Sequence, residues 1–253
     1  MTSAELRVQA LLRLGDNALV LAQRLCEWVG KGPALEEDMA LSNVGLDLLG
    51  QARLWLGYAG EIEGRGRDED QIAFLRDANE FHNLLLVERP NGNYADTMVR
   101  QFFFDTAHQL MLQGLAGSAD PRVADIAAKA LKEVHYHLRR SGDLIVRMGD
   151  GTDESRRLTQ AAVDELWMYT GEMFSTDAVD EAMTAQGLMP LPSTLRQPWL
   201  DHVGQVLAEG TLQMPPADAW MQSGGKQGRH TEALGFLLAE MQFLQRTYPG
   251  ARW

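Results

Sequence analysis

The sequence predicts an all-α protein with a single domain over residues 1–253. Apolar residues recur every three or four positions along most of the chain, which is the period of an amphipathic helix. Capping signals such as Thr2-Ser3-Ala4-Glu5 and Asp120-Pro121 stand where these periodic stretches begin. No pair of segments shows the alternating pattern of neighbouring strands, and no solenoid repeat is present.

The first half of the chain predicts two long helices and a shorter one. The capping box at Thr2 opens a helix that reaches about residue 29 and ends at Gly30-Lys31-Gly32-Pro33. A second helix is expected over about 34–62, with an acidic first turn that suits the positive helix N-terminus. A shorter helix is expected at about 69–87. The apolar stripe of the second helix is formed by Leu35, Met39, Leu46, Leu49, Ala52 and Leu56.

The second half predicts two further long helices and then several short ones. The long helices cover about 94–117 and 121–149, and Asp120 caps the second with proline at its first position. The residues from 152 to 248 predict additional helices. One starts at Thr152, and the others cover about 176–186, 194–209 and 232–248, with 211–216 extended.

The order of the helices predicts a ferritin-like four-helix bundle with additional helices. Two hairpins, 3–62 and 94–149, are joined by about thirty residues that hold a helix of their own. A long central crossover places the second hairpin in ferritin-like order, because short loops join only antiparallel neighbours. An ordinary up-and-down bundle is the alternative that periodicity leaves open.

Composition excludes several classes of function. The chain has 35 acidic and 23 basic residues, a formal net charge of −12, which disfavours binding to nucleic acid or to an anionic membrane. One cysteine, Cys26, excludes an internal disulfide framework and a Cys-rich metal site. No signal peptide and no run of eighteen apolar residues is visible, so we expect a cytoplasmic protein with no membrane span.

The second hairpin holds part of a di-iron ligand set. Ferritin-like bundles that activate oxygen use a carboxylate on the first helix of each hairpin and Glu-x-x-His on the second. Asp105 lies in a strongly apolar stretch, and His137 follows on the next helix. The glutamate expected three residues before His137 is Val134, and Glu133 is one step away, about 100° round the helix.

The first hairpin holds less of the set. Gln51 stands at the expected histidine position and Leu48 at the glutamate position. The nearest acid on the first helix is Asp16, so that ligand is absent or displaced. Asp105 and His137 are therefore vestigial candidates, and we expect no metal, no cofactor and no catalytic residue in this chain. We expect the two side chains to lie buried, within reach of each other or of one buried partner.

Three other candidates favour structural roles. His108 stands three residues after Asp105 and could complete a metal half-site, although such pairs are more often structural. His230 stands at a helix start, where capping or an interface is the expected role. Of His135 and His137, at most one can point inward, because the two lie on different helix faces.

Several long stretches carry a resemblance to a known family. They resemble the C subunits of the bacterial ring 1,2-phenylacetyl-CoA epoxidase, and the likeness runs from about residue 10 to Trp253. The stretches are Arg13–Leu21, Asn43–Arg53, Asn83–Thr97, Lys129–Arg139, Gly224–Glu232 and Leu238–Arg246.

The resemblance implies a role in aerobic phenylacetate catabolism. It implies a multicomponent oxygenase that epoxidises the ring of phenylacetyl-CoA with O₂ and with NADPH electrons from a reductase subunit. The A subunit would be the di-iron catalytic partner, and the C subunit its non-catalytic, structural relative. Leu48, Gln51 and Val134 agree with that division of labour.

Three hypotheses follow, namely a non-catalytic partner subunit, a metal-binding oxygenase or oxidase active in its own right, and an iron-storage bundle. The missing carboxylates favour the first. We then expect a pseudo-symmetric heterodimer with the A subunit and, without that partner, a homodimer of the chain alone. The helix 94–117 is a candidate for part of the contact, through Tyr94, Met98, Phe102 and Met111.

Overall fold

The computed structural model describes residues 1–251, so the last two residues of the predicted domain lie outside the described part. The described residues form helices and 3₁₀ turns with no strand, which confirms the all-α class. The chain divides into two compact units, residues 1–90 with 224–253 and residues 91–223. The extent of a single domain over 1–253 stays a prediction. No helix within residues 1–251 is long and apolar enough to cross a bilayer.

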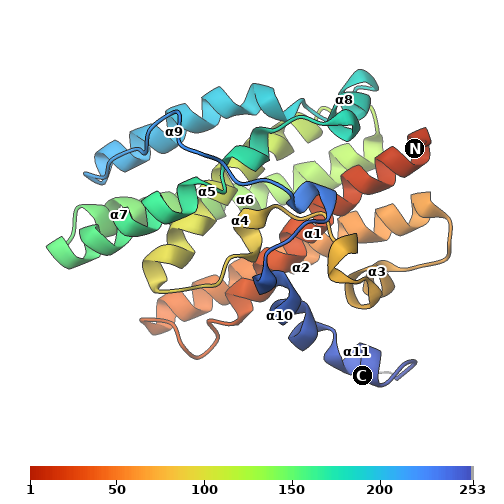
Figure 1. The fold of residues 1–253 in the computed structure, drawn as a ribbon, viewed down its shortest axis with the longest axis horizontal. Coiled ribbons are helices and arrows are strands. Elements are labelled where there is room, and N and C mark those ends of the chain that lie inside the picture. The colour runs from red at the N-terminus through yellow and green to blue at the C-terminus, as the bar shows by residue number, and fades with distance from the viewer. Residues whose placement is uncertain (252–253) are drawn as a thin grey trace. The chain divides into compact units, whose positions relative to one another are not determined.

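The first unit is built on an antiparallel hairpin of α1 (Ser3–Cys26) and α2 (Leu35–Glu63), shown in red and orange in Figure 1. α3 (Glu69–Leu75) packs on α2, and the short α4 (Leu85–Glu88) packs on α1. The C-terminal segment returns to this unit as α10 (Glu232–Met241) and α11 (Phe243–Thr247), and α11 contacts α3.

The second unit is built on a hairpin of α5 (Tyr94–Leu115) and α6 (Pro121–Gly149). Both helices contact α7 (Asp153–Trp167) and α9 (Arg196–Glu209). Along the chain, α7 and α9 are connected through the 3₁₀ turn η2 (Gly171–Phe174), α8 (Ala178–Ala185) and the 3₁₀ turn η3 (Pro192–Leu195). Four long helices in two hairpins therefore stand where the sequence predicts them.

Local capping chemistry sets the starts of the long helices. The Glu5 amide donates to Thr2 Oγ1 at 3.2 Å, and the Thr2 amide donates to Glu5 Oε2 at 2.8 Å, which completes the predicted capping box. Asp120 Oδ1 accepts from the amides of Arg122 and Val123 at 2.9 and 3.4 Å, and Pro121 takes the first position of α6.

The single helix predicted over 69–87 is wrong, because the chain leaves the helix at Arg76. Arg76 and Asp77 adopt extended backbone, and the segment continues as a 3₁₀ turn over Ala78–Glu80 before α4. The Arg76 Nε donates to the Ile72 carbonyl at 2.7 Å, so the side chain takes over a carbonyl that a continuing helix would have satisfied.

The last helix, predicted over 232–248, is interrupted at Gln242. Its side-chain amide donates to the carbonyls of Ala73 and Arg76 at 3.1 and 3.0 Å. α10 and α11 are thus separated at the residue that ties the C-terminal segment to the end of α3.

The predicted stripe of α2 is wrong in its first half. Leu35, Met39 and Leu46 are 72%, 57% and 63% exposed. Ala52 and Leu56 are buried as expected. The buried face of α2 instead runs through Leu41, Val44, Leu48 and Trp55, on the opposite side of the helix from the exposed row.

Candidate functional site

Asp105 stands on α5 at the predicted ligand position and is fully buried. Gln101 Nε2, one turn earlier on the same helix, donates to Asp105 Oδ1 at 2.7 Å. The Ser141 hydroxyl of α6 donates to Asp105 Oδ2 at 2.8 Å. Both carboxyl oxygens are therefore engaged by neutral donors, which satisfies a buried carboxyl without a metal ion.

Burial raises the pKa of Asp105 to about 6, and the nearby His137 and the two hydrogen bonds from Ser141 and Gln101 only partly offset the loss of solvation. His137 is 1% exposed and lies on α6, one turn before Ser141. The expectation that Asp105 and His137 are both buried is thus confirmed. His135 is exposed, so one of the two neighbouring histidines points inward, as expected.

Val134, one turn before His137, is fully buried on the same face of α6. Glu133 is half-buried and lies on a neighbouring face, as predicted. The position from which a Glu-x-x-His carboxylate would project beside His137 is therefore apolar. Around this position the buried donor set consists of the Asp105 carboxyl and the imidazoles of His108 and His137.

His108 is buried on α5 but does not pair with Asp105 in a metal half-site. Its ring packs against Phe104 with centroids 5.0 Å apart, and its Nδ1 has no hydrogen-bond partner among the described residues. Burial, together with the charge of His137, lowers the pKa of His108 to about 3. His108 is thus a neutral imidazole at pH 7.

Replacing Asp105 tests this buried centre. Asp105→Ala should lower the free energy of unfolding by about 1–3 kcal/mol, because Gln101 and Ser141 lose their acceptor. Asp105→Asn should cost less, since it retains an oxygen for Gln101 and Ser141 already lies 3.3 Å from the Leu138 carbonyl. Urea unfolding at pH 4 to 8 measures both.

The pH dependence of Asp105→Asn gives a second, independent readout. The folded-state pKa of Asp105, about 6, lies above the unfolded value of about 3.9, so the folded chain binds the proton more tightly. The contribution of Asp105 to the free energy of unfolding is fully present below about pH 4 and is lost as the pH rises through about 6. The free energy of unfolding of wild type minus that of Asp105→Asn should therefore fall between about pH 4 and about pH 6. A difference that does not change with pH would contradict a buried carboxyl with a raised pKa.

In the first unit the corresponding positions are also buried and lack carboxylates. Leu48 and Gln51 of α2 are 0% and 1% exposed. Asp16 of α1 is fully buried, and both of its oxygens accept from the Arg76 guanidinium. Its Oδ2 also accepts from the His82 amide at 2.8 Å. The acid nearest to the expected ligand position is thus held in a buried ion pair.

Among residues 1–251, no group of three or more His, Cys, Asp or Glu side chains is placed to hold a metal ion. That this chain binds no metal stays a prediction for metal analysis.

A second buried polar cluster, which the sequence analysis does not predict, is centred on Glu88. Glu88 Oε2 lies 2.8 Å from His230 Nδ1 and accepts from Asn83 Nδ2 at 3.0 Å. Glu88 Oε1 accepts from the Thr231 amide at 2.6 Å. His230 Nε2 lies 2.8 Å from the Phe81 carbonyl. His230 therefore neither caps a helix nor stands free for an interface; it ties the C-terminal segment to α4.

The His230 imidazole is charged more readily than a free one. Burial by itself lowers the pKa of His230, but the hydrogen bonds to Glu88 and to the Phe81 carbonyl outweigh it and raise the pKa.

Gly225 lets the returning C-terminal segment approach residue 83 closely, because a Cβ at position 225 would come within 2.1 Å of the Asn83 carbonyl oxygen. The sequence feature that could indicate this buried cluster is Glu88 itself, a single acid directly after the apolar residues 84–87.

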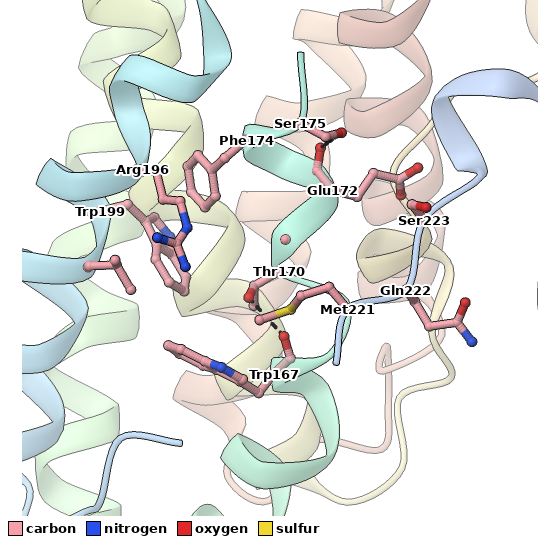
Figure 2. A pocket seen from close by; sticks show the side chains of 12 residues that line it. Trp167, Thr170, Glu172, Phe174, Ser175, Arg196, Trp199, Met221, Gln222 and Ser223 are labelled. Carbon is pink, nitrogen blue, oxygen red and sulfur yellow. Dashed lines mark hydrogen bonds between the residues drawn. The ribbon is translucent and has the colours of Figure 1, made fainter. Parts of the chain in front are cut away.

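A pocket of about 330 Å³ opens in the second unit (Figure 2). Its walls come from the end of α7, the η2 turn, the start of α9 and the extended segment 221–223. The Gln222 amide fixes this segment by donating to the Met168 carbonyl at 2.7 Å. The buried side chains of Trp167, Phe174 and Trp199 line it, and the exposed Arg196 stands at its edge.

The sequence hypothesis for the partner contact is partly wrong. Met98 and Phe102 of α5 are fully buried within the chain, so their side chains are not available to a partner. The larger exposed apolar side chains of the hairpins include Leu35, Met39 and Leu46 on α2 and Tyr136 on α6.

The comparison with known proteins decides the family. The family model for the phenylacetic acid catabolic protein matches residues 2–253. This chain belongs to that family. It is also 52% identical over 242 residues to the C subunit of the 1,2-phenylacetyl-CoA epoxidase of Escherichia coli K12, a match that covers 96% of this chain and 97% of the relative.

Membership of the phenylacetic acid catabolic protein family confirms the resemblance seen in the sequence and the ferritin-like class expected from the order of the helices. The positions at which the sequence analysis expects iron ligands are buried and hold Leu48, Gln51 and Val134. The buried acids of the two hairpins, Asp16, Asp105 and Asp120, each accept hydrogen bonds from protein donors.

Proposed function

We propose that this chain is a non-catalytic subunit of a multicomponent oxygenase that epoxidises phenylacetyl-CoA, and that it stabilises a related di-iron catalytic subunit. The observation that carries the proposal is the donor set of the two hairpins. Two buried positions that would require glutamate hold Leu48 and Val134, and Gln51 replaces a histidine. A di-iron centre needs hard carboxylate oxygens, so these side chains argue against such a centre in this chain.

The proposed partner is the A subunit of the same oxygenase. The support is the name of the relative, which is one subunit of an epoxidase, and the fold class, since related bundles pack with pseudo-twofold symmetry. A permanent contact of this kind buries upward of about 2,000 Å² in total. A cytoplasmic location, predicted from the sequence, belongs to this proposal.

The test combines metal analysis with reconstitution. The purified chain should carry well below one iron per chain and should not consume O₂ with phenylacetyl-CoA, NADPH and reductase. When it is added to its proposed di-iron partner, the two should co-elute at micromolar concentration and epoxide formation should rise.

A variant sharpens the distinction between a structural and a catalytic role. Asp105→Asn leaves the shape of the buried centre intact, so turnover of the reconstituted complex should match that of wild type. Stoichiometric di-iron in this chain, or a large loss of turnover from Asp105→Asn without dissociation, would favour the alternative of an oxygenase active in its own right.

A further inference from the structure

α2 carries a second apolar row, on the side opposite its buried face. Leu35, Met39 and Leu46 are each more than half exposed, and their spacing of four and seven residues places them on one face of the helix, where Gly50 continues the row. We call these four residues the outer row. Single exposed apolar side chains are common on proteins, but a contiguous row marks an interaction surface. A helix that is apolar on two opposite faces is expected to be covered on both.

The outer row has a gap at one end and a long side chain at the other. Gly50 is exposed, and a Cβ built there would contact no atom of the neighbouring elements within 4 Å. Another molecule can therefore bring an apolar side chain close to the helix backbone at this point. Met39 and Gly50 lie equally far, in opposite directions, from the midpoint between Asn43 and Leu46.

Opposite charges flank the two ends of the outer row. Glu36, in the first turn of α2, is exposed and makes no hydrogen bond or ion pair within residues 1–251. Arg53 is also exposed; its Nε pairs with Glu69 at 3.0 Å, and its two terminal nitrogens have no partner in the described part of the chain. Glu36 and Arg53 again lie equally far from the midpoint between Asn43 and Leu46. This face of α2 is thus complementary in charge to an antiparallel copy of itself.

We propose that two copies of this chain pair through the outer row, with their α2 helices antiparallel about a twofold axis at the midpoint between Asn43 and Leu46. In that register, Met39 of each copy lies over Gly50 of the other copy, so that the long side chain fills the gap. The two Leu46 side chains meet beside the axis, where pairing removes their apolar surface from water.

The same axis brings Glu36 of each copy opposite Arg53 of the other copy. The contact is isologous, so the steric fit and the charge pair each occur twice. Like charges would face each other if the two helices were parallel and in register, and this favours the antiparallel arrangement. The pairing does not rest on the proposed oxygenase function, because it involves neither a metal nor a second kind of subunit.

Sedimentation velocity of the full chain between about 1 and 100 µM measures the pairing. The mass should rise with concentration from the 28.1 kDa of one chain toward twice that value. Leu46→Asp should keep the chain monomeric at about 100 µM, because it places two carboxylates beside the axis. Phe236→Asp replaces an exposed apolar side chain of α10 and is the matched control, which should pair as wild type does. Thermal melts check that each variant is folded.

Gly50→Leu separates a specific contact from general hydrophobic association. The variant adds exposed apolar surface, and the chain itself has room for the new side chain. Non-specific association would therefore become stronger. In the proposed register the added side chain fills the space that Met39 of the other copy needs, so pairing should weaken at least about tenfold.

An exchange of charges tests the register directly. Glu36→Arg alone and Arg53→Glu alone each place like charges opposite each other twice, so each variant should pair several-fold more weakly with itself than wild type does. A one-to-one mixture of the two variants restores opposite charges at both contacts. The mixture should therefore pair as tightly as wild type.

Four outcomes would overturn the proposal. One is a chain that stays monomeric at about 100 µM; if Leu46→Asp then still prevents co-elution with the proposed di-iron subunit, that subunit covers the outer row in place of a second copy. The second is a Gly50→Leu variant that pairs as tightly as wild type or more tightly. The third is a mixture of the two charge variants that pairs no better than either alone, and the fourth is a loss of pairing in Phe236→Asp but not in Leu46→Asp.

Discussion

Arg76→Met should lower the free energy of unfolding by about 3–5 kcal/mol, the usual cost of removing one partner of a buried ion pair. Arg76 and Asp16 are 2% and 0% exposed, and the guanidinium contacts both oxygens of the carboxylate. In the variant, the His82 amide is the remaining donor to a buried charge. Urea unfolding at pH 7, followed by circular dichroism, gives the value from the shift in midpoint at constant slope.

The matched control is Arg53→Met, in the same unit. Arg53 pairs with Glu69 at 3.0 Å, but its side chain is 77% exposed, so its loss should cost under about 1 kcal/mol. The double variant Asp16→Leu with Arg76→Met should regain much of the lost stability, because no buried charge remains. If Arg76→Met costs no more than Arg53→Met, the pair does not hold α3 to α1.

Glu88→Ala should lower the free energy of unfolding by at least about 2 kcal/mol. The Thr231 amide and His230 Nδ1 each lose a buried acceptor, at about 1–3 kcal/mol apiece. Since these contacts hold the C-terminal segment, limited proteolysis should cut between residues 224 and 251 faster than in wild type. Glu240→Ala, an exposed acid on α10, is the control and should change neither measurement.

The effect of Glu88→Ala should also depend on pH. The pKa of His230 is raised in the folded chain, so the charged pair contributes fully below the unfolded pKa of about 6.5. That contribution is lost as the pH rises through the raised, folded value. The difference between wild type and variant should therefore be larger at pH 6 than at pH 9. Equal differences at both values would show that His230 acts as a neutral hydrogen-bond partner.

The long helices could be predicted from the sequence because their signals are local. A capping box at Thr2 and a proline after Asp120 act within one turn, and the apolar period is repeated over several turns. The candidate centre could be predicted in the same way, since Val134, His137 and Asp105 are placed by helical spacing alone. The sequence does not predict which of the two apolar rows of α2 is buried. Leu46 and Leu48 each lie in a row with helical spacing, but only the row of Leu48 is buried.

The all-α class, the two long hairpins and the shortage of iron ligands follow from local sequence patterns. The points where helices break and the polar groups that meet depend on the packing of the folded chain. α3 ends where Arg76 reaches an acid 60 residues earlier in the chain, and His230 meets an acid 142 residues earlier. The physical reason is that a periodic pattern specifies a face, whereas a buried charge is stabilised by whichever distant donor the packed chain brings to it.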